Sequence, residues 1–297
     1  MQRRFATLDV FTARRFTGNP LAVVLDAEGL DAEVMQAIAR EFGHPETVFV
    51  LPAAQAGHRA KLRIFTPARE IPFAGHPTVG TAVLLGLRDG AAAGHAMVLE
   101  EAVGPVRCVL ERASAVHGFV RFTAPLLPSE TGPAPDDATI AAGLGLAPAD
   151  IGFGAFRPAK FSAGNPLTFV PVSGLAAIKR CRPVPGAFAE AFGNMGLAYV
   201  YCSETAAPEH QFHARMFAPE HGIPEDPATG SAGAAFPGVI AKFAPLGDGS
   251  HVIRIEQGYE MGRPSLIEAT VTVANGAIAA VAIGGEAVIV TSGAIEA

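Results

Sequence analysis

Cysteine, tryptophan and positive charge are scarce in this chain of 297 residues. It has three cysteines and no tryptophan, and 28 acidic residues outnumber 22 lysines and arginines, for a formal net charge of -6. Cys108, Cys181 and Cys202 are scattered and form no C-x-x-C pair, so we predict no disulfide framework and expect a cytoplasmic location. The acidic balance argues against a nucleic-acid partner, because binding phosphates requires clustered lysines and arginines.

Long apolar runs and the usual cofactor motifs are missing as well. No stretch reaches the roughly 20 apolar residues that cross a bilayer, so we expect no membrane partner. A G-x-S-x-G elbow, a P-loop and a G-x-G-x-x-G turn are all absent, which argues against a serine hydrolase, a phosphate cradle and a dinucleotide-binding fold. His210, His213 and His221 lack the spacing of a helical H-E-x-x-H site, so we expect no metal.

Glycine, proline and apolar side chains are plentiful. With 33 glycines, 24 prolines and 49% hydrophobic residues, the composition favours short strands joined by tight turns over a helical bundle. The length is typical of two medium-sized domains.

The sequence repeats itself, and the repeat predicts two similar domains. Four blocks recur in the same order, among them 18–21 with 164–167, 63–67 with 215–219, and 77–82 with 227–232. Repeated blocks in a fixed order indicate duplication of a structural unit. We predict an N-terminal domain over 1–124, a linker over 125–137 and a C-terminal domain over 138–290, with a C-terminal tail that packs on the first domain.

Local patterns place helices and strands within each half. Apolar residues at a spacing of four predict helices over 32–42 and 187–195, and alternation predicts strands between 97 and 124 and between 252 and 290. The small apolar residues that follow Pro77 and Pro227 predict a buried helix in each half, with Pro at its start. Two domains related by a pseudo-twofold axis enclose a cleft, where we expect a small-molecule site.

The predicted helix start in the first half carries Gly75, His76, Pro77 and Thr78. Free N–H groups and the helix dipole at such an end favour an anion, and a substrate carboxylate would fit. His76 could give this anion a hydrogen bond or a proton, or it could be a solvent-facing or satisfied core imidazole.

The second half has Asp226, Gly230 and Ser231 at the matching helix start. Asp226 could be the N-cap of this helix, since Asp before Pro is a common helix beginning. Its alignment with His76 favours a catalytic role, because pseudosymmetry brings matching positions toward one cleft. Ser231 and Gly230 offer a hydroxyl and backbone amides for a substrate.

Glu46 stands at the mouth of an otherwise apolar strand. A carboxyl group in such a place is desolvated, which raises its pKa toward the range that suits a general acid and base. An exposed glutamate at a strand edge is the alternative.

Together these blocks resemble the phenazine-biosynthesis PhzF-like family. The resemblance is carried by residues 9–12, 18–23, 46–49, 63–67, 73–78 and 225–232, which span nearly the whole chain. It implies an α/β fold of two pseudo-symmetric domains like those of diaminopimelate epimerase, each a mostly antiparallel, barrel-like sheet around a central helix. It also implies isomerase chemistry without a cofactor, in which Glu46 shuttles the proton while His76, Asp226 and Ser231 orient the substrate and assist.

We accordingly expect an isomerase that moves a proton between carbons of a small carboxylate or amino-acid metabolite in the interdomain cleft. The alternatives are a cofactor-independent amino-acid epimerase or racemase and a non-catalytic binding protein on the same scaffold. A racemase that uses two thiols is disfavoured, because no cysteine lies near either helix start. A homodimer through an exposed sheet edge is compatible with such a fold.

Overall fold

The computed structural model describes residues 1–297 and divides them into two compact units. Unit 1 comprises Met1–Pro125 and Ile283–Ala297, and unit 2 comprises Leu126–Ala282. The segment 125–137, predicted as a linker, carries the short strand β9 (Ser129–Gly132) and reaches the first residue of helix α3 (Asp137–Leu144).

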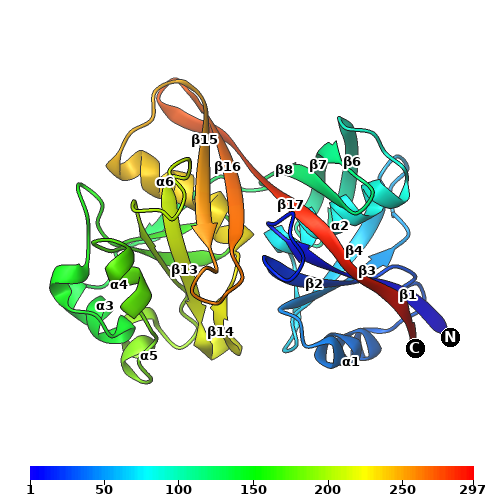
Figure 1. Ribbon diagram of the computed structural model, residues 1–297, viewed down its shortest axis with the longest axis horizontal. Helices are drawn as coiled ribbons and strands as arrows, with labels where there is room; N and C mark the ends of the chain where they lie inside the picture. The colour runs from blue at the N-terminus through cyan, green and yellow to red at the C-terminus, as the bar shows by residue number, and fades with distance from the viewer. The chain divides into compact units, whose positions relative to one another are not determined.

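Unit 1 is a closed sheet. Its strand β1 pairs antiparallel with β2 and β17, β2 runs parallel to β3, and the sheet continues through β4, β6, β7 and β8 until β8 meets β17 again. Most of these pairs are antiparallel, and Figure 1 shows the strands wrapping around one helix. The strands are β1 (Gln2–Val10), β2 (Asn19–Val24), β3 (Glu46–Leu51), β4 (Ala60–Phe65), β5 (Glu70–Ile71), β6 (His95–Glu101), β7 (Gly104–Ala113), β8 (His117–Thr123) and the part of β17 (Ala277–Glu296) from Ile283 onward.

The central helix of unit 1 is α2 (Gly75–Arg88), which is buried from Gly75 to Gly86. It packs against β1, β2, β3, β6, β7 and β8. Gly80 shows why its residues are small: a Cβ there would lie 2.7 Å from Val10 and 2.6 Å from Leu21. The apolar, small-residue composition of this segment is therefore a condition for enclosing it in the sheet.

Helix α1 (Ala32–Phe42) has the bounds that its apolar spacing predicts. Asp31 caps it by accepting a hydrogen bond from the backbone N–H of Val34, and Gly43 ends it in the left-handed conformation at φ 62°. Both signals are local in sequence, so the ends of this helix can be predicted from the residues next to them.

Unit 2 repeats the strand pairings of unit 1. The parallel pair β2–β3 has its counterpart in β11–β12, and the parallel pair β4–β6 in β13–β15. Its elements are β9, α3, β10 (Ala159–Ser162), β11 (Pro166–Pro171), α4 (Leu175–Arg180), α5 (Ala187–Phe192), β12 (Ala198–Cys202), β13 (Phe212–Ala218), β14 (Ile223–Asp226), α6 (Gly230–Phe243), β15 (Gly249–Gln257) and β16 (Ser265–Ala274). Helix α5 is shorter than the predicted 187–195, because Gly193 leaves the helical conformation at φ 86°.

The central helix of unit 2 is α6, which packs against β9, β10, β11 and β16 (Figure 1). Phe236 on this helix meets the rings of Tyr199, Tyr201 and Phe212 at centroid distances of 4.7 to 6.0 Å. Phe236 therefore has aromatic neighbours, whereas Gly80 of α2 faces the aliphatic side chains of Val10 and Leu21.

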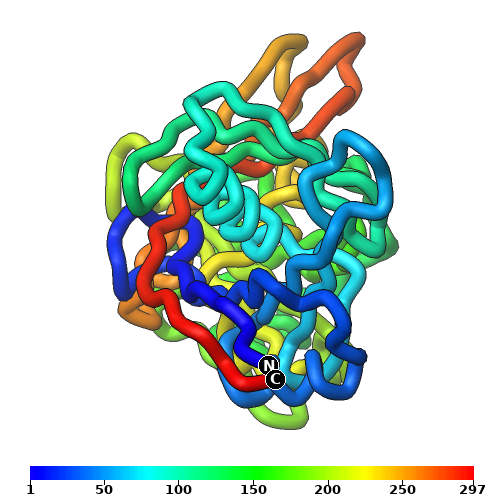
Figure 2. Tube along the Cα trace, turned by 90° about the vertical axis from the view of Figure 1, so that its right-hand side faces the viewer, coloured from blue at the N-terminus to red at the C-terminus, as the bar shows by residue number.

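The predicted fold class, two α/β domains with barrel-like sheets around central helices, is confirmed. The two termini lie side by side in unit 1, where β1 and the end of β17 form an antiparallel pair from Gln2 with Glu296 onward (Figure 2). None of the helices is both long and apolar enough to cross a membrane.

Candidate active site

Glu46 and His76 meet in unit 1. Glu46 is the first residue of β3 and His76 the second residue of α2. The Nε2 atom of His76 lies 3.2 Å from Oε2 of Glu46, and the side chains are 4% and 13% exposed, respectively. Two of the three predicted catalytic residues thus form a close pair that is largely shielded from water.

The His76 imidazole is held as a neutral ring. Burial lowers its pKa to about 3, a backbone hydrogen bond to Pro20 opposes this shift, and the nearby His44 adds to it. A neutral imidazole has one N–H donor and one acceptor nitrogen. Toward Glu46 it can therefore either donate to a carboxylate or accept from a carboxylic acid.

Asn19 completes this group. It is fully buried at the start of β2, and its Nδ2 lies 3.3 Å from Nδ1 of His76. Asn19 was not among the site residues predicted from the sequence, although it belongs to the repeated Gly-Asn-Pro-Leu block. Its repeat partner Asn165 is exposed, so the repeat alone did not distinguish a site residue from a turn residue.

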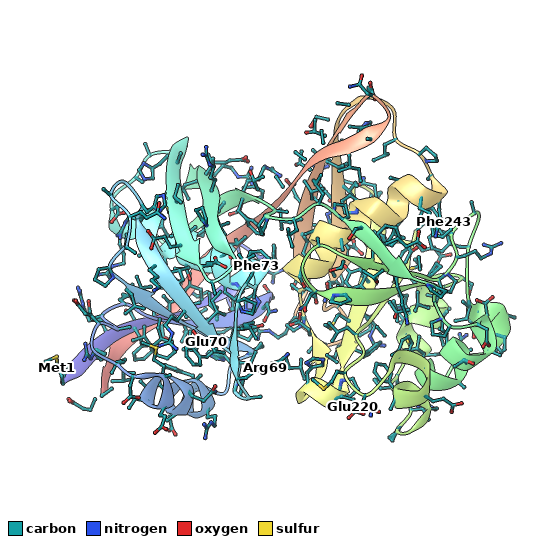
Figure 3. The ribbon with its side chains drawn as sticks, turned by 180° about the vertical axis from the view of Figure 1, so that it is seen from behind. Met1, Arg69, Glu70, Phe73, Glu220 and Phe243 are labelled. Atoms are coloured by element: carbon teal, nitrogen blue, oxygen red, sulfur yellow. The ribbon has the colours of Figure 1, made fainter.

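The approach to α2 is fixed by contacts on both sides of the preceding turn. Glu70 of β5 binds Arg63 of β4 through two hydrogen bonds of 2.7 Å, and the ring of Phe73 packs edge-on against Phe122 at 5.8 Å. Figure 3 labels Glu70 and Phe73 on this stretch. These contacts hold in place the segment that precedes α2.

Helix α2 begins at Gly75, two residues before the predicted start, so Pro77 is its third residue. No side chain caps this end. The backbone N–H and the hydroxyl of Thr78 both point to the carbonyl oxygen of Ala74. The N–H groups of Gly75 and His76 have no acceptor within the helix, so they are the free donors at this helix start.

In unit 2, Asp226 ends β14 and accepts a hydrogen bond of 2.6 Å from the hydroxyl of Thr229. Thr229, not Asp226, is the N-cap residue of α6, which begins at Gly230 rather than at the predicted Pro227. The N-cap interpretation of Asp226 is therefore wrong. Ser231, the second residue of α6, is partly exposed, whereas Gly230 is buried.

A threonine at each helix start contacts the end of a neighbouring strand. Thr78 contacts Glu101 at the end of β6, and Thr229 contacts Gln257 at the end of β15. Each hydroxyl thus contacts the last residue of a strand, although Thr78 is the fourth residue of α2 and Thr229 is the N-cap residue of α6.

The histidines considered as metal ligands have other partners. His210 and His213 each lie within 2.8 Å of the buried carboxylate of Glu256, and His221 lies 3.1 Å from the carbonyl oxygen of Met195. The structure contains no group of three or more histidine, cysteine, aspartate or glutamate side chains arranged to hold a metal ion.

The three thiols lie in the cores of the units, and all three cysteines are free and buried. Burial raises the pKa of Cys108, and it raises the pKa values of Cys181 and Cys202 to about 12. None of these cysteines belongs to the residues that begin α2 or α6.

Comparison with known proteins gives matches over nearly the whole chain. A family model described as phenazine biosynthesis-like protein matches residues 8–293. The chain is 48% identical over 299 residues to an uncharacterized isomerase of Mesorhizobium japonicum, with 98% of each protein covered. It is 34% identical over 282 residues to the trans-2,3-dihydro-3-hydroxyanthranilate isomerase of Pseudomonas aeruginosa, with 95% of each covered. The crystal structure of a PhzF-family phenazine biosynthesis protein of Bacillus anthracis matches at a TM-score of 0.90 and 27% identity over the full length of both chains.

Proposed function

Because the chain is an isomerase that belongs to the phenazine biosynthesis-like family, we propose that it moves a proton between two carbon atoms of a small carboxylate or amino-acid metabolite without a cofactor. The observation that carries this proposal is the contact of 3.2 Å between Glu46 and the neutral imidazole of His76. Such a pair is suited to taking up one proton and giving it back.

The proton balance of the reaction is simple. In the first step a C–H bond of the substrate breaks, its electron pair shifts into the adjacent unsaturated system, and the proton forms an O–H bond on the Glu46 carboxylate. In the second step the same proton returns to a different carbon. The neutral His76 ring keeps its own proton in both states, and its Nε2 stays beside the carboxyl group of Glu46.

The burial of this pair supports internal return of the proton. A proton on an exposed carboxylate exchanges with water rapidly, whereas Glu46 is only 13% exposed and His76 only 4%. Water exclusion also strengthens the electrostatic contacts made to the reacting atoms.

The substrate carboxylate is proposed to bind at uncapped helix starts. Of the predicted binding residues, Gly75 and His76 at α2 and Gly230 and Ser231 at α6 supply N–H groups that have no partner within their helices. Pro77 has no N–H, and both donors of Thr78 are directed to the Ala74 carbonyl. We therefore assign Pro77 and Thr78 the shaping of the α2 end.

Asp226 is proposed as a second group that orients the substrate and assists proton movement in the same interdomain site. The support for this part is the family resemblance and the pairing of its carboxylate with Thr229 at the start of α6. If Asp226 serves the same substrate, Asp226→Asn lowers turnover; an unchanged rate would separate Asp226 from the reaction.

Solvent deuterium tests the proposed reaction class. The protein is incubated in D2O with trans-2,3-dihydro-3-hydroxyanthranilate, the compound in the name of the Pseudomonas relative, and with a panel of cyclic and amino-acid carboxylates, and the products are examined by NMR. Formation of a double-bond isomer supports the proposal. Exchange at a single stereocentre of a panel member would instead indicate epimerisation, and binding without exchange or conversion would indicate a non-catalytic binding protein.

A further inference from the structure

Glu101 is a buried carboxyl group that the proposed reaction does not use. It is the last residue of β6 and is 7% exposed. One carboxyl oxygen, Oε1, lies 2.7 Å from the hydroxyl oxygen of Thr78, and the other, Oε2, is buried without a hydrogen-bond partner. A carboxylate in such a place would leave one charged oxygen uncompensated.

No cation faces Glu101 from the elements around it. On β7, Cys108 is the titratable group that shares its face of the sheet. Lys61 of β4 and Arg107 of β7 are exposed and pair in register with Glu100 and Val98, which point to the opposite face.

Helix α2 contributes no cation at this place either. Its titratable residues are His76, whose pKa is about 3, and Arg88 at the far end of the helix. No neighbouring positive charge is thus available to stabilise an ionised Glu101.

A count of protons at Thr78 indicates the state of Glu101. The Thr78 hydroxyl oxygen lies 2.8 Å from the carbonyl oxygen of Ala74 and 2.7 Å from Oε1 of Glu101. A threonine hydroxyl has one proton, and a carbonyl oxygen and a carboxylate both only accept. Both contacts are hydrogen bonds only if Thr78 donates to Ala74 and a protonated Glu101 donates to Thr78.

In unit 2 the corresponding contact joins Thr229 to Gln257, whose amide group is always neutral. The hydroxyl of Thr229 donates a hydrogen bond of 2.6 Å to the carboxylate of Asp226 and accepts one of 3.0 Å from Nε2 of Gln257. The orientation of the Gln257 amide is fixed, because its Oε1 accepts from the backbone N–H of Thr229 and its Nε2 donates to the Asp226 carbonyl. At the position equivalent to Glu101, the repeat therefore has a neutral hydrogen-bond donor.

We propose that Glu101 is a neutral carboxylic acid that donates its proton to Thr78 and so positions the start of helix α2, and with it His76. Glu101 is a positioning residue, since it contacts Thr78 and not the Glu46–His76 pair. Its ionisation removes the donor, turns Thr78 toward a new negative charge and releases the Ala74 carbonyl from the hydroxyl. The protonation state of Glu101 does not depend on the proposed function. Only an effect of Glu101 on turnover rests on that function.

Burial also raises the pKa of Glu101 to about 8, although the contact with the Thr78 hydroxyl favours the charged form and opposes this shift. For a group with a raised folded-state pKa, the stabilisation is fully present below the unfolded pKa of 4.5 and is lost as the pH rises to about 8. The protein should therefore lose stability over this interval through Glu101 and reach a plateau above it.

Glu101→Gln tests the proposal, because glutamine reproduces the Gln257 arrangement without a proton to lose. The melting temperature of E101Q minus that of the wild type should rise by several degrees as the pH increases from 4.5 to 8 and then stay constant. Glu100→Gln, which removes a carboxylate on the opposite face of the same strand, is the matched control and should not show this rise. A difference that is independent of pH, or that falls with increasing pH, would overturn the proposal.

Infrared and NMR spectra test the same state directly and need no substrate. At neutral pH the wild type should show the carbonyl stretch of a buried carboxylic acid, and E101Q should lack it. The ring signals of His76 should move with pH near 8 in the wild type and stay constant in E101Q. Absence of the carboxylic-acid band, or equal movement of His76 in both proteins, contradicts the proposal whether or not the reaction is an isomerisation.

Discussion

Arg215 binds Glu225 in the interior of unit 2 through two hydrogen bonds of 2.8 Å. The Nη1 atom of Arg215 also donates to the carbonyl oxygens of Ile178 and Cys181. One guanidinium thus joins β13, β14 and the C-terminal end of α4. The repeat offers a natural comparison, because Arg63 makes the same bidentate pair with Glu70 in unit 1 but is more exposed.

Replacing each arginine with alanine should destabilise the protein more at the less exposed ion pair, Arg215 with Glu225, than at the more exposed pair, Arg63 with Glu70. Arg215→Ala leaves a half-buried carboxylate and two buried carbonyl oxygens without their donor and should lower the free energy of unfolding by about 3–5 kcal/mol. Arg63→Ala should lower it by only about 0–1 kcal/mol. Urea unfolding of both variants checks this, and equal losses would show that burial does not set the difference.

Much of the fold follows from local patterns in the sequence. Helix α1 has the predicted bounds, because Asp31 and Gly43 cap it with residues adjacent to its ends. The small-residue helices α2 and α6 were also predicted, but their first residues were not. Those starts depend on contacts with distant strands, such as Thr229 with Gln257, and the prolines used to place them do not begin either helix.

The candidate site was predicted in part. Glu46 and His76 were selected one by one, and the structure brings them together. Asn19 and Glu101 were not selected, because an asparagine in a Gly-Asn-Pro turn and a glutamate at a strand end are ordinary surface residues in sequence terms. Their importance comes from burial, which depends on how the sheet of unit 1 closes around α2.

His213 should make stability depend on pH in the direction opposite to that of an ordinary buried histidine. Burial lowers its pKa, but hydrogen bonds to Glu260 and Glu256 outweigh burial and raise it overall. The stabilisation from a protonated His213 is therefore complete below the unfolded pKa of 6.5 and is lost as the pH rises through the folded-state value. The unfolding free energy of His213→Gln should fall furthest below the wild type on the acid side, and urea titrations across this range measure it. A deficit that grows with rising pH would reverse the assignment.

His76 should not titrate where free histidines do. With a pKa of about 3 it remains neutral in the folded protein, while the unfolded chain takes up a proton near 6.5. The protein should lose stability through His76 as the pH falls from 6.5 toward 3, and His76→Gln should lose less over the same interval. Nitrogen-15 NMR of the ring checks the neutral state, and an imidazolium signal in the folded protein near pH 6.5 would contradict it.

The role of Glu46 as proton carrier is tested most directly by Glu46→Gln, which keeps the shape of the side chain and removes its basicity. Double-bond isomerisation in D2O should fall by at least about 10²-fold, while the melting temperature and ligand binding stay close to those of the wild type. Glu41→Gln, at an exposed position on α1, is the control and should keep full turnover. Isomerisation by E46Q at the wild-type rate would contradict the account.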